Sequence, residues 1–384
     1  MAMFQPATAC SGRFATLVAA LAVSRSTAAP NKVTVQGRRV LVNGVPVHLK
    51  GANWNPVPLG KVHPEGLDYV GEVERDSKLM QAAGINAVRT YECVCDVGVL
   101  DVLWSRGIYV LNTVFANANN PLELVAQKVN AVKNHPAVLM WVAGNEWNYN
   151  GCYAGLSHDG CMDYIARAAT IAKQHDGLHP VASIYGHLPS LEVVGNLSMI
   201  DIWGANFYNG LHFEYEDEEE NVTKNLFSVW EERTKLPLFI GEYGSDAWDT
   251  RYNREDHAAQ AEAVKTLTED IVSHSSLKEG GVVLGGMIFE WADEWWKDYT
   301  GNESTHDSTG FNWGGGPHPD LRFNEEWWGL VDIDRNPRPA YYAYKSVARP
   351  SWSSPDAADL AHRGPDHSDR GAGRRLATLL PVQV

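Results

Sequence analysis

The stretch NHPAVLMWVAGNEWN, residues 134–148, decides the fold of this 384-residue chain. Its centre, residues 137–143, is an uninterrupted apolar run, and after one glycine come two polar residues, Asn145 and Glu146. A short apolar run rich in valine and aromatic residues is typical of a strand in a parallel sheet. We therefore expect a buried strand whose carboxyl end presents an amide and a carboxyl group.

Seven more runs of this kind occur along the chain, and amphipathic stretches of helical length separate them. The predicted strands are His48–Trp54, Ala87–Thr90, Tyr109–Val114, Val138–Asn145, Val181–Tyr185, Ile200–Asn206, Leu238–Glu242 and Met287–Trp291. The predicted helices are Leu67–Ala83, Val97–Ser105, Leu122–Lys133, Met162–His175, Thr223–Thr234, Asp256–His274 and Ala340–Val347. Eight βα units indicate an α/β fold of the (β/α)₈ TIM-barrel type, because a doubly wound open sheet normally has fewer strands. Residues 33–49 contain two turn signals and predict a short β-hairpin before the barrel.

The ends of the chain differ in composition from its middle. Residues 1–28 combine Arg13, an apolar stretch and small residues at 26–28, which is typical of a secretory signal peptide; an organelle-targeting leader is the alternative. We expect residues 32–348 to form the catalytic domain and 349–384, rich in polar residues and proline, to be a disordered tail. The expected location is therefore extracellular. Three sequons are compatible with N-glycosylation on that route: Asn196, Asn221 and Asn302.

The cysteines also suit an oxidising compartment. Loss of Cys10 with the leader would leave four, an even number. A bridge between Cys93 and Cys95 would be strained, so we expect that segment to pair with Cys152 and Cys161, although a Cys152–Cys161 bridge is also feasible. The spacing is not that of a zinc site, and we expect no metal and no cofactor.

The charge of the chain restricts its partners. Its formal net charge is −15, and no basic run interrupts it. Phosphate backbones and anionic membranes would be repelled, so we expect neither a nucleic acid nor a membrane partner. Residues 213–221 (FEYEDEEEN) read as a solvated acidic loop.

Two glutamates stand where predicted strands end, Glu146 on the fourth and Glu242 on the seventh. The active site of a TIM barrel forms at the carboxyl ends of its strands. Hydrolysis of an acetal needs one acid to protonate the leaving oxygen and one carboxylate to attack or to activate water. A lone glutamate at a strand end is more often structural, but two glutamates in this placement favour catalysis.

Five segments carry a resemblance to a known family. They are NHPAVLMWVAGNEWN at 134–148, PLFIGEYGSD at 237–246, VNGVPVHLKGANW at 42–54, IDIWGANFYNG at 200–210 and WGLVDIDRNPRPAYYAYK at 328–345. Over residues 38–348 the chain resembles the retaining barrel glycosidases of clan A, most closely the catalytic barrel of glycoside hydrolase family 2. The resemblance implies that Glu146 is the acid/base, Glu242 the nucleophile and Asn145 the partner of the sugar 2-hydroxyl.

Other strand-end residues are candidates for supporting roles. Arg89 and Tyr208 could keep Glu242 ionised, although Arg89 could instead form a structural ion pair and Tyr208 could be a core aromatic. Trp291, at the end of the eighth strand, is the expected platform beneath the sugar. The remaining substrate-binding candidates are Asn53, Trp54, Trp147, His187 and Asn206, of which Trp147 would also keep Glu146 protonated by burying it.

The expected partner is a carbohydrate. Family 2 enzymes usually carry β-sandwich domains ahead of the barrel, whereas here only a hairpin is expected. Many tryptophans in predicted loops favour a β-linked oligo- or polysaccharide of the mannan or glucan type, hydrolysed by double displacement. A β-glucan transglycosylase with the same two glutamates, and a carbohydrate-binding protein without catalysis, remain as alternatives.

Overall fold

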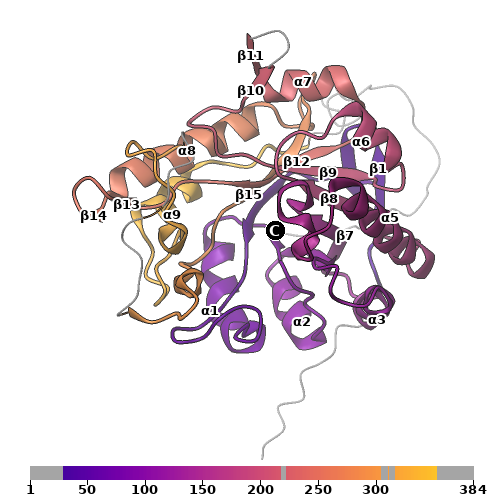
Figure 1. The fold of residues 1–384 in the computed structure, drawn as a ribbon, viewed down its shortest axis with the longest axis horizontal. Coiled ribbons are helices and arrows are strands. Elements are labelled where there is room, and N and C mark those ends of the chain that lie inside the picture. Colours follow the sequence, from indigo (N-terminus) through magenta and orange to yellow (C-terminus); the bar gives the residue numbers. More distant parts are fainter. Residues whose placement is uncertain (1–28, 218–221, 304–309, 311–315, 353–384) are drawn as a thin grey trace, which may run out of the picture.

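The computed structural model describes residues 29–217, 222–303, 310 and 316–352. Eight parallel strands close into a barrel in the order β12-β15-β4-β5-β6-β7-β8-β9, with helices packed around them (Figure 1). The strands are β4 (Leu49–Asn53), β5 (Ala87–Arg89), β6 (Tyr109–Phe115), β7 (Val138–Asn145), β8 (Val181–Tyr185), β9 (Ile202–Asn206), β12 (Leu238–Tyr243) and β15 (Val283–Ile288). The TIM-barrel prediction is confirmed.

The helices follow the strands as a barrel requires. They are α1 (Tyr69–Ala82), α2 (Val97–Ser105), α3 (Glu123–Val132), the short α4 (Trp147–Asn150), α5 (His158–His175), α6 (Leu191–Asn196), α7 (Leu226–Arg233), α8 (His257–Ser273) and α9 (Pro339–Ser346). Capping side chains determine where several of them begin. Asp68, Asp96 and Ser157 each accept a hydrogen bond from a backbone N–H three residues later, at the starts of α1, α2 and α5. Such caps pair donors that a helix leaves free at its first turn.

The amino-terminal hairpin closes one end of the barrel. Strands β1 (Val33–Gln36), β2 (Arg39–Val42) and β3 (Val45–Pro46) form a small antiparallel sheet. Its Val40 is fully buried in one cluster with the side chains inside the barrel, which contributes about 1.5–3 kcal/mol. The Val33 N–H donates to the carbonyl of Leu178, just before β8. The predicted hairpin is therefore confirmed, and it covers the amino-terminal ends of the strands.

Two element predictions need correction. The eighth strand begins at Val283, four residues before the predicted start, because Gly285 and Gly286 hide its apolar pattern. A Cβ at Gly285 would collide with the backbone of Leu49, so the close approach of β4 and β15 requires glycine there. The predicted loop at 213–221 instead contains β10 (Glu214–Asp217), which pairs with β11 (Val222–Asn225) and shortens the predicted helix; residues 218–221 lie outside the described chain.

The predicted cysteine pairing is wrong. Cys93 and Cys95 form a disulfide, and their Cα atoms lie 5.5 Å apart, within the usual range for a bridge. Cys152 and Cys161 are buried and carry free thiols.

Several predictions concern parts of the chain that the structure does not cover. The signal peptide at 1–28, the sequon at Asn221 and tail residues 353–384 lie outside the described residues. The other two sequon asparagines, Asn196 and Asn302, are exposed, and their glycosylation stays a prediction. None of the described helices combines the length and the apolar character needed to cross a bilayer.

Candidate active site

A cavity of about 470 Å³ opens at the carboxyl ends of the barrel strands. The strands supply its floor: Asn145 and Glu146 come from the end of β7, Glu242 from β12, and Tyr208 from the segment after β9. Both glutamates that the sequence singles out therefore line one cavity. This is the end of the barrel opposite the hairpin, where a TIM barrel places its chemistry.

A local turn aims Glu146 into the cavity. Gly144 has φ +83°, and a Cβ there would collide with side chains of Ile165 and Trp147, so only glycine fits. Glu146 itself has φ +46°, a conformation that L residues with side chains adopt rarely. Strained backbone of this kind clusters at functional sites, where the surrounding structure holds it in place.

Glu242 is the most heavily hydrogen-bonded side chain of the cavity. Its Oε1 accepts hydrogen bonds from Arg89 Nη1 and from the Tyr91 hydroxyl, both at 2.8 Å. Its Oε2 accepts one from the Tyr208 hydroxyl at 2.9 Å. Burial, followed by the charge of Glu242, raises the pKa of both tyrosines well above its usual value, so both remain donors. Donors and a cation around one carboxylate stabilise its negative charge.

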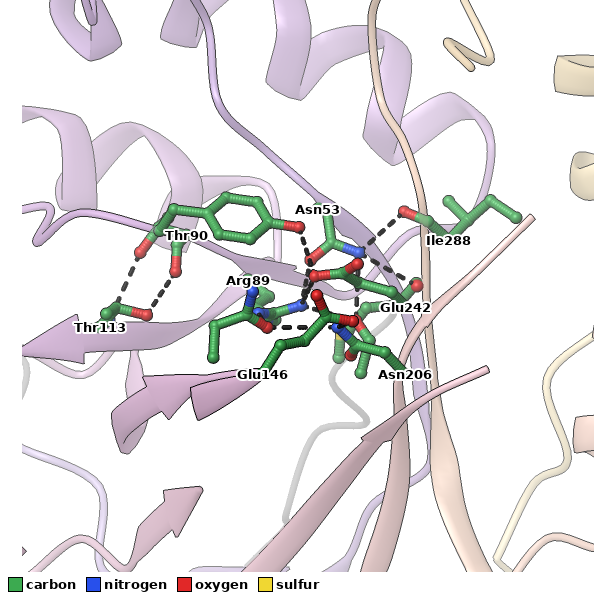
Figure 2. Close-up of polar contacts among 12 residues, drawn as sticks. Asn53, Arg89, Thr90, Thr113, Glu146, Asn206, Glu242 and Ile288 are labelled. Atoms are coloured by element: carbon green, nitrogen blue, oxygen red, sulfur yellow. Dashed lines mark hydrogen bonds and ion pairs between the residues drawn. The ribbon is translucent and has the colours of Figure 1, made fainter. Parts of the chain in front are cut away.

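Glu146 has the opposite surroundings. The amide of Asn206 donates to its Oε1 at 2.9 Å (Figure 2). Burial and then the charge of Glu242 raise the pKa of Glu146 to about 7. Near neutral pH, Glu146 can therefore hold a proton beside the arginine-bound Glu242. Such a split between two carboxyl groups marks acid and base roles.

Arg89 bonds Glu242 directly and is connected to Glu146 through Asn145 and Asn206. Besides Glu242, it donates to Oδ1 of Asn53 at 3.0 Å through Nη1 and to Oδ1 of Asn145 at 2.6 Å through Nη2. Asn206 donates to the same Asn145 oxygen at 3.2 Å and to Glu146. Figure 2 shows Asn53, Arg89 and Asn206 gathered around the two carboxyl groups. The structure thus brings together Arg89, Asn145, Asn206 and Tyr208 as the sequence predicts.

The predicted tryptophans are not at the cavity. Trp54 donates to Asp76 at 2.9 Å on the α1 side of β4, Trp147 donates to Ser183 at 3.0 Å, and Trp291 packs on Tyr341. All three are at most 1% exposed. β15 ends at Ile288, three residues before Trp291, and Phe289 rather than Trp291 lines the cavity. Large aromatics are as useful in a core as in a sugar cleft, and the sequence pattern does not separate these roles.

Two further candidates do not line the cavity, although one of them, Asn53, bonds to Arg89 beside it. Asn53 is fully buried, and its amide donates to the carbonyls of Gly241, Met287 and Ile288, so it holds strand ends together. His187 packs edge-on against Tyr149 and Tyr185. Burial lowers the pKa of His187, and its ring faces the carbonyl of Leu188.

The cavity contains residues that sequence reasoning missed. Tyr91 could have been found, because it lies two residues after Arg89 and side chains two apart in extended chain share a face. Glu294, Lys297, Phe323, Glu325 and Trp328 come from the long segment between β15 and α9. Nothing in their spacing points to the cavity. Trp328 meets Tyr208 edge-on at 5.1 Å and stacks on Phe323 at 5.7 Å, forming the aromatic wall expected of Trp291.

One group of possible metal ligands lies together within the described residues: Asp249, Asp256 and His318. None of the three lines the cavity. Asp249 is held by Arg251, whose Nε and Nη2 reach its two oxygens at 2.9 and 2.7 Å. The chemistry of the two glutamates does not pass through this group.

A protonated carboxyl group beside an arginine-bound carboxylate, at the carboxyl end of a closed (β/α)₈ barrel, defines the class of retaining barrel glycosidases. The family comparison agrees with that class. Residues 116–351 match the model described as "Glycosyl hydrolases family 2, TIM barrel domain", and the chain belongs to that family.

Individual relatives share about a quarter of the sequence. The β-glucuronidase of Mus musculus is 24% identical over 275 residues, which are 68% of this chain and 41% of that enzyme. A β-galactosidase of Pectobacterium atrosepticum is 27% identical over 173 residues, 39% of this chain and 14% of the enzyme. The structure of a β-D-glucuronidase from Dictyoglomus thermophilum superposes with a TM-score of 0.58 at 19% identity, covering 84% of this chain and 55% of that one. The structural likeness shows the fold, and this chain spans less than half the length of these two curated relatives.

Proposed function

We propose that this protein is a retaining β-glycosidase that cleaves O-glycosyl bonds of a β-linked oligo- or polysaccharide, with Glu242 as nucleophile and Glu146 as acid/base. The observation that carries the proposal is the contrast between the two carboxyl groups. Glu242 accepts three hydrogen bonds, one from a guanidinium, whereas burial raises the pKa of Glu146 to about 7. Membership of family 2 supports the same assignment.

The chemistry takes place in two steps. In the first, Glu242 Oε bonds to the anomeric carbon, the glycosidic C–O bond breaks, and the Glu146 proton moves to the leaving oxygen. In the second, Glu146 takes a proton from water, the water oxygen bonds to the anomeric carbon, and the ester to Glu242 breaks. Asn145 lines the cavity beside both groups, and Arg89 and Asn206 engage its amide oxygen, so its amide nitrogen is the atom that would donate to the sugar 2-hydroxyl.

The cavity walls suit a saccharide of the glucan or mannan type. Phe323 and Trp328 offer apolar rings for the C–H face of a sugar, and Asn55 and Asn117 offer amides for its hydroxyls. A cavity of about 470 Å³ lies within the usual range for binding sites of small molecules.

Replacement of either glutamate by glutamine tests the proposal. Glu146→Gln removes the proton donor and should lower kcat about 10²–10⁴-fold. Glu242→Gln should lower it at least as much, because no covalent intermediate can form. Release of reducing sugar from β-1,3- and β-1,4-glucans and β-1,4-mannan is the measurement.

A matched control is Glu269→Gln on α8, whose carboxyl group is 56% exposed and forms a surface pair with Lys265. This variant should keep the parent rate. Turnover by Glu146→Gln or Glu242→Gln at the rate of that control would refute the assignment.

A further inference from the structure

The charges of the cavity bear on which sugar it accepts. Among the described residues that line it, Lys297 is the one lysine or arginine, against five glutamates: Glu92, Glu146, Glu242, Glu294 and Glu325. The stretches 304–309 and 311–315, outside the described residues, contain no lysine or arginine in their sequence.

Lys297 already has two carboxyl partners, Glu325 and Glu294. Its Nζ lies 2.8 Å from Glu325 Oε2 and 3.7 Å from Glu294 Oε2, and it also lies over the rings of Trp296 and Phe289. Burial opposes its charge, but Glu325 and Glu294 outweigh burial and raise the pKa of Lys297 above its usual value. Glu325 and Glu294 therefore both engage the one ammonium group of the described cavity lining.

Two other basic groups near the cavity, Arg89 and His63, also offer no cation to a substrate carboxylate. Arg89 is fully buried and bonded to Glu242, Asn145 and Asn53. Burial, followed by the charge of Lys297, lowers the pKa of His63 to about 4, so its imidazole is neutral at physiological pH. A carboxylate on the substrate would find no uncommitted cation among these groups.

The cavity would bind a sugar with a carboxylate at C6 less favourably than one with a hydroxymethyl group there. A uronate would be brought against Glu294 and Glu325, and like charges placed together in a binding site are strongly unfavourable. A hydroxyl can instead donate to these carboxylates, and Glu294 is well placed because it is 2% exposed and already fixed by Asn55 at 2.7 Å.

We infer that this cavity selects sugars without a carboxylate, that is, neutral hexosyl residues of gluco or manno type, and rejects uronic acids. The inference rests on the proposed function. It also separates this chain from its relatives, several of which are named β-glucuronidase while another, of similar identity, is named β-galactosidase. The names of the relatives therefore do not identify the sugar that this chain accepts. The inference rests instead on the pairing of Lys297 with Glu325 and Glu294.

Substrate pairs that differ only at C6 test the inference on the full chain. Suitable pairs are 4-nitrophenyl β-D-glucoside with its β-D-glucuronide, and β-1,4-mannan oligosaccharides with β-1,4-mannuronate oligosaccharides. We expect kcat/KM for the neutral member to exceed that of the acid by at least about 100-fold. A preference for the acid in either pair would overturn the inference and leave the proposed function standing. Failure to cleave any member of both pairs would count against the proposed function itself.

Two variants locate the cause. Glu325→Gln removes the closer partner of Lys297 without changing the shape of the side chain, and it should narrow the neutral-to-acid ratio about tenfold. The surface variant Glu269→Gln should leave the ratio unchanged. An unchanged ratio in Glu325→Gln would show that the charge of Glu325 does not act against a uronate. Loss of uronide cleavage alone in Lys297→Met would show that Lys297 binds the substrate carboxylate. Either result would contradict the inference.

Discussion

At the residue scale, the site is defined by two glutamates that have different hydrogen-bond partners. Glu146 and Glu242 are both glutamates at strand ends, and the sequence identifies both. Their contacts separate them: Arg89, Tyr91 and Tyr208 donate to Glu242, whereas the Asn206 amide donates to Glu146. Sequence reasoning could place Arg89 and Tyr208 because they too follow strands.

The pKa of Glu146 predicts an alkaline limit to activity. Glu146 must be protonated to act as acid, and its pKa is about 7, so kcat/KM should fall about tenfold per pH unit above that value. The limit should appear with phenyl glycosides, whose poor leaving group needs the proton. It should flatten with 2,4-dinitrophenyl glycosides, whose leaving group does not.

The Glu146→Gln variant is the control for this profile. Its residual kcat/KM on the phenyl glycoside should lack the decline above pH 7. A decline of the same steepness and midpoint in that variant would assign the alkaline limit to another group.

At the scale of elements, regular structure could be predicted and irregular structure could not. The period of the apolar runs locates seven barrel strands (β4–β9 and β12) and most helices within a few residues. The glycine pair in β15 interrupts the apolar run. The predicted eighth strand therefore begins four residues too late, and Trp291 is wrongly placed at its end. Glu294, Lys297 and Glu325 lie between β15 and α9 in loops and 3₁₀ turns, where no repeating pattern reports position.

A buried ion pair joins the two ends of that long segment. Arg338, just before α9, makes a bidentate contact with Asp293 at 2.6 and 2.8 Å, and both side chains are nearly inaccessible. Arg338→Ala would leave the Asp293 carboxyl buried without its cation. We expect a loss of about 3–5 kcal/mol in the free energy of unfolding, measured by chemical denaturation.

An exposed arginine provides the comparison. Arg167 pairs with Asp163 at 3.2 Å on the surface of α5, with both side chains more than half exposed. Arg167→Ala should cost at most about 1 kcal/mol. Equal losses in the two variants would mean that the Arg338 pair does not hold the segment.

At the scale of the whole molecule, the barrel has one closed and one open end. The hairpin β1–β3 covers the amino-terminal ends of the strands, and its Val40 joins the interior cluster. The cavity with both glutamates lies at the other end. The sequence predicted this division, since barrel topology alone assigns chemistry to the carboxyl ends of the strands. It did not predict the Cys93–Cys95 disulfide, because the local backbone path that brings the two Cα atoms to 5.5 Å has no signal in residue spacing.

Product analysis at this scale separates hydrolysis from transfer. Water and a sugar hydroxyl can both accept the glycosyl group from Glu242, so a β-glucan transglycosylase remains open as an alternative. Products longer than the starting oligosaccharide would indicate transfer, and shorter products alone would indicate hydrolysis.

Trapping the covalent intermediate tests the central claim most directly. A 2-deoxy-2-fluoro-β-glucosyl or β-mannosyl fluoride slows the second step, so the glycosyl group should remain on the enzyme. Mass spectrometry of the digested protein should then find one added fluoro-sugar on the peptide that contains Glu242, and none in Glu242→Gln. A label on another residue, or efficient turnover of neutral β-glycans by the Glu242→Gln variant, would contradict the account.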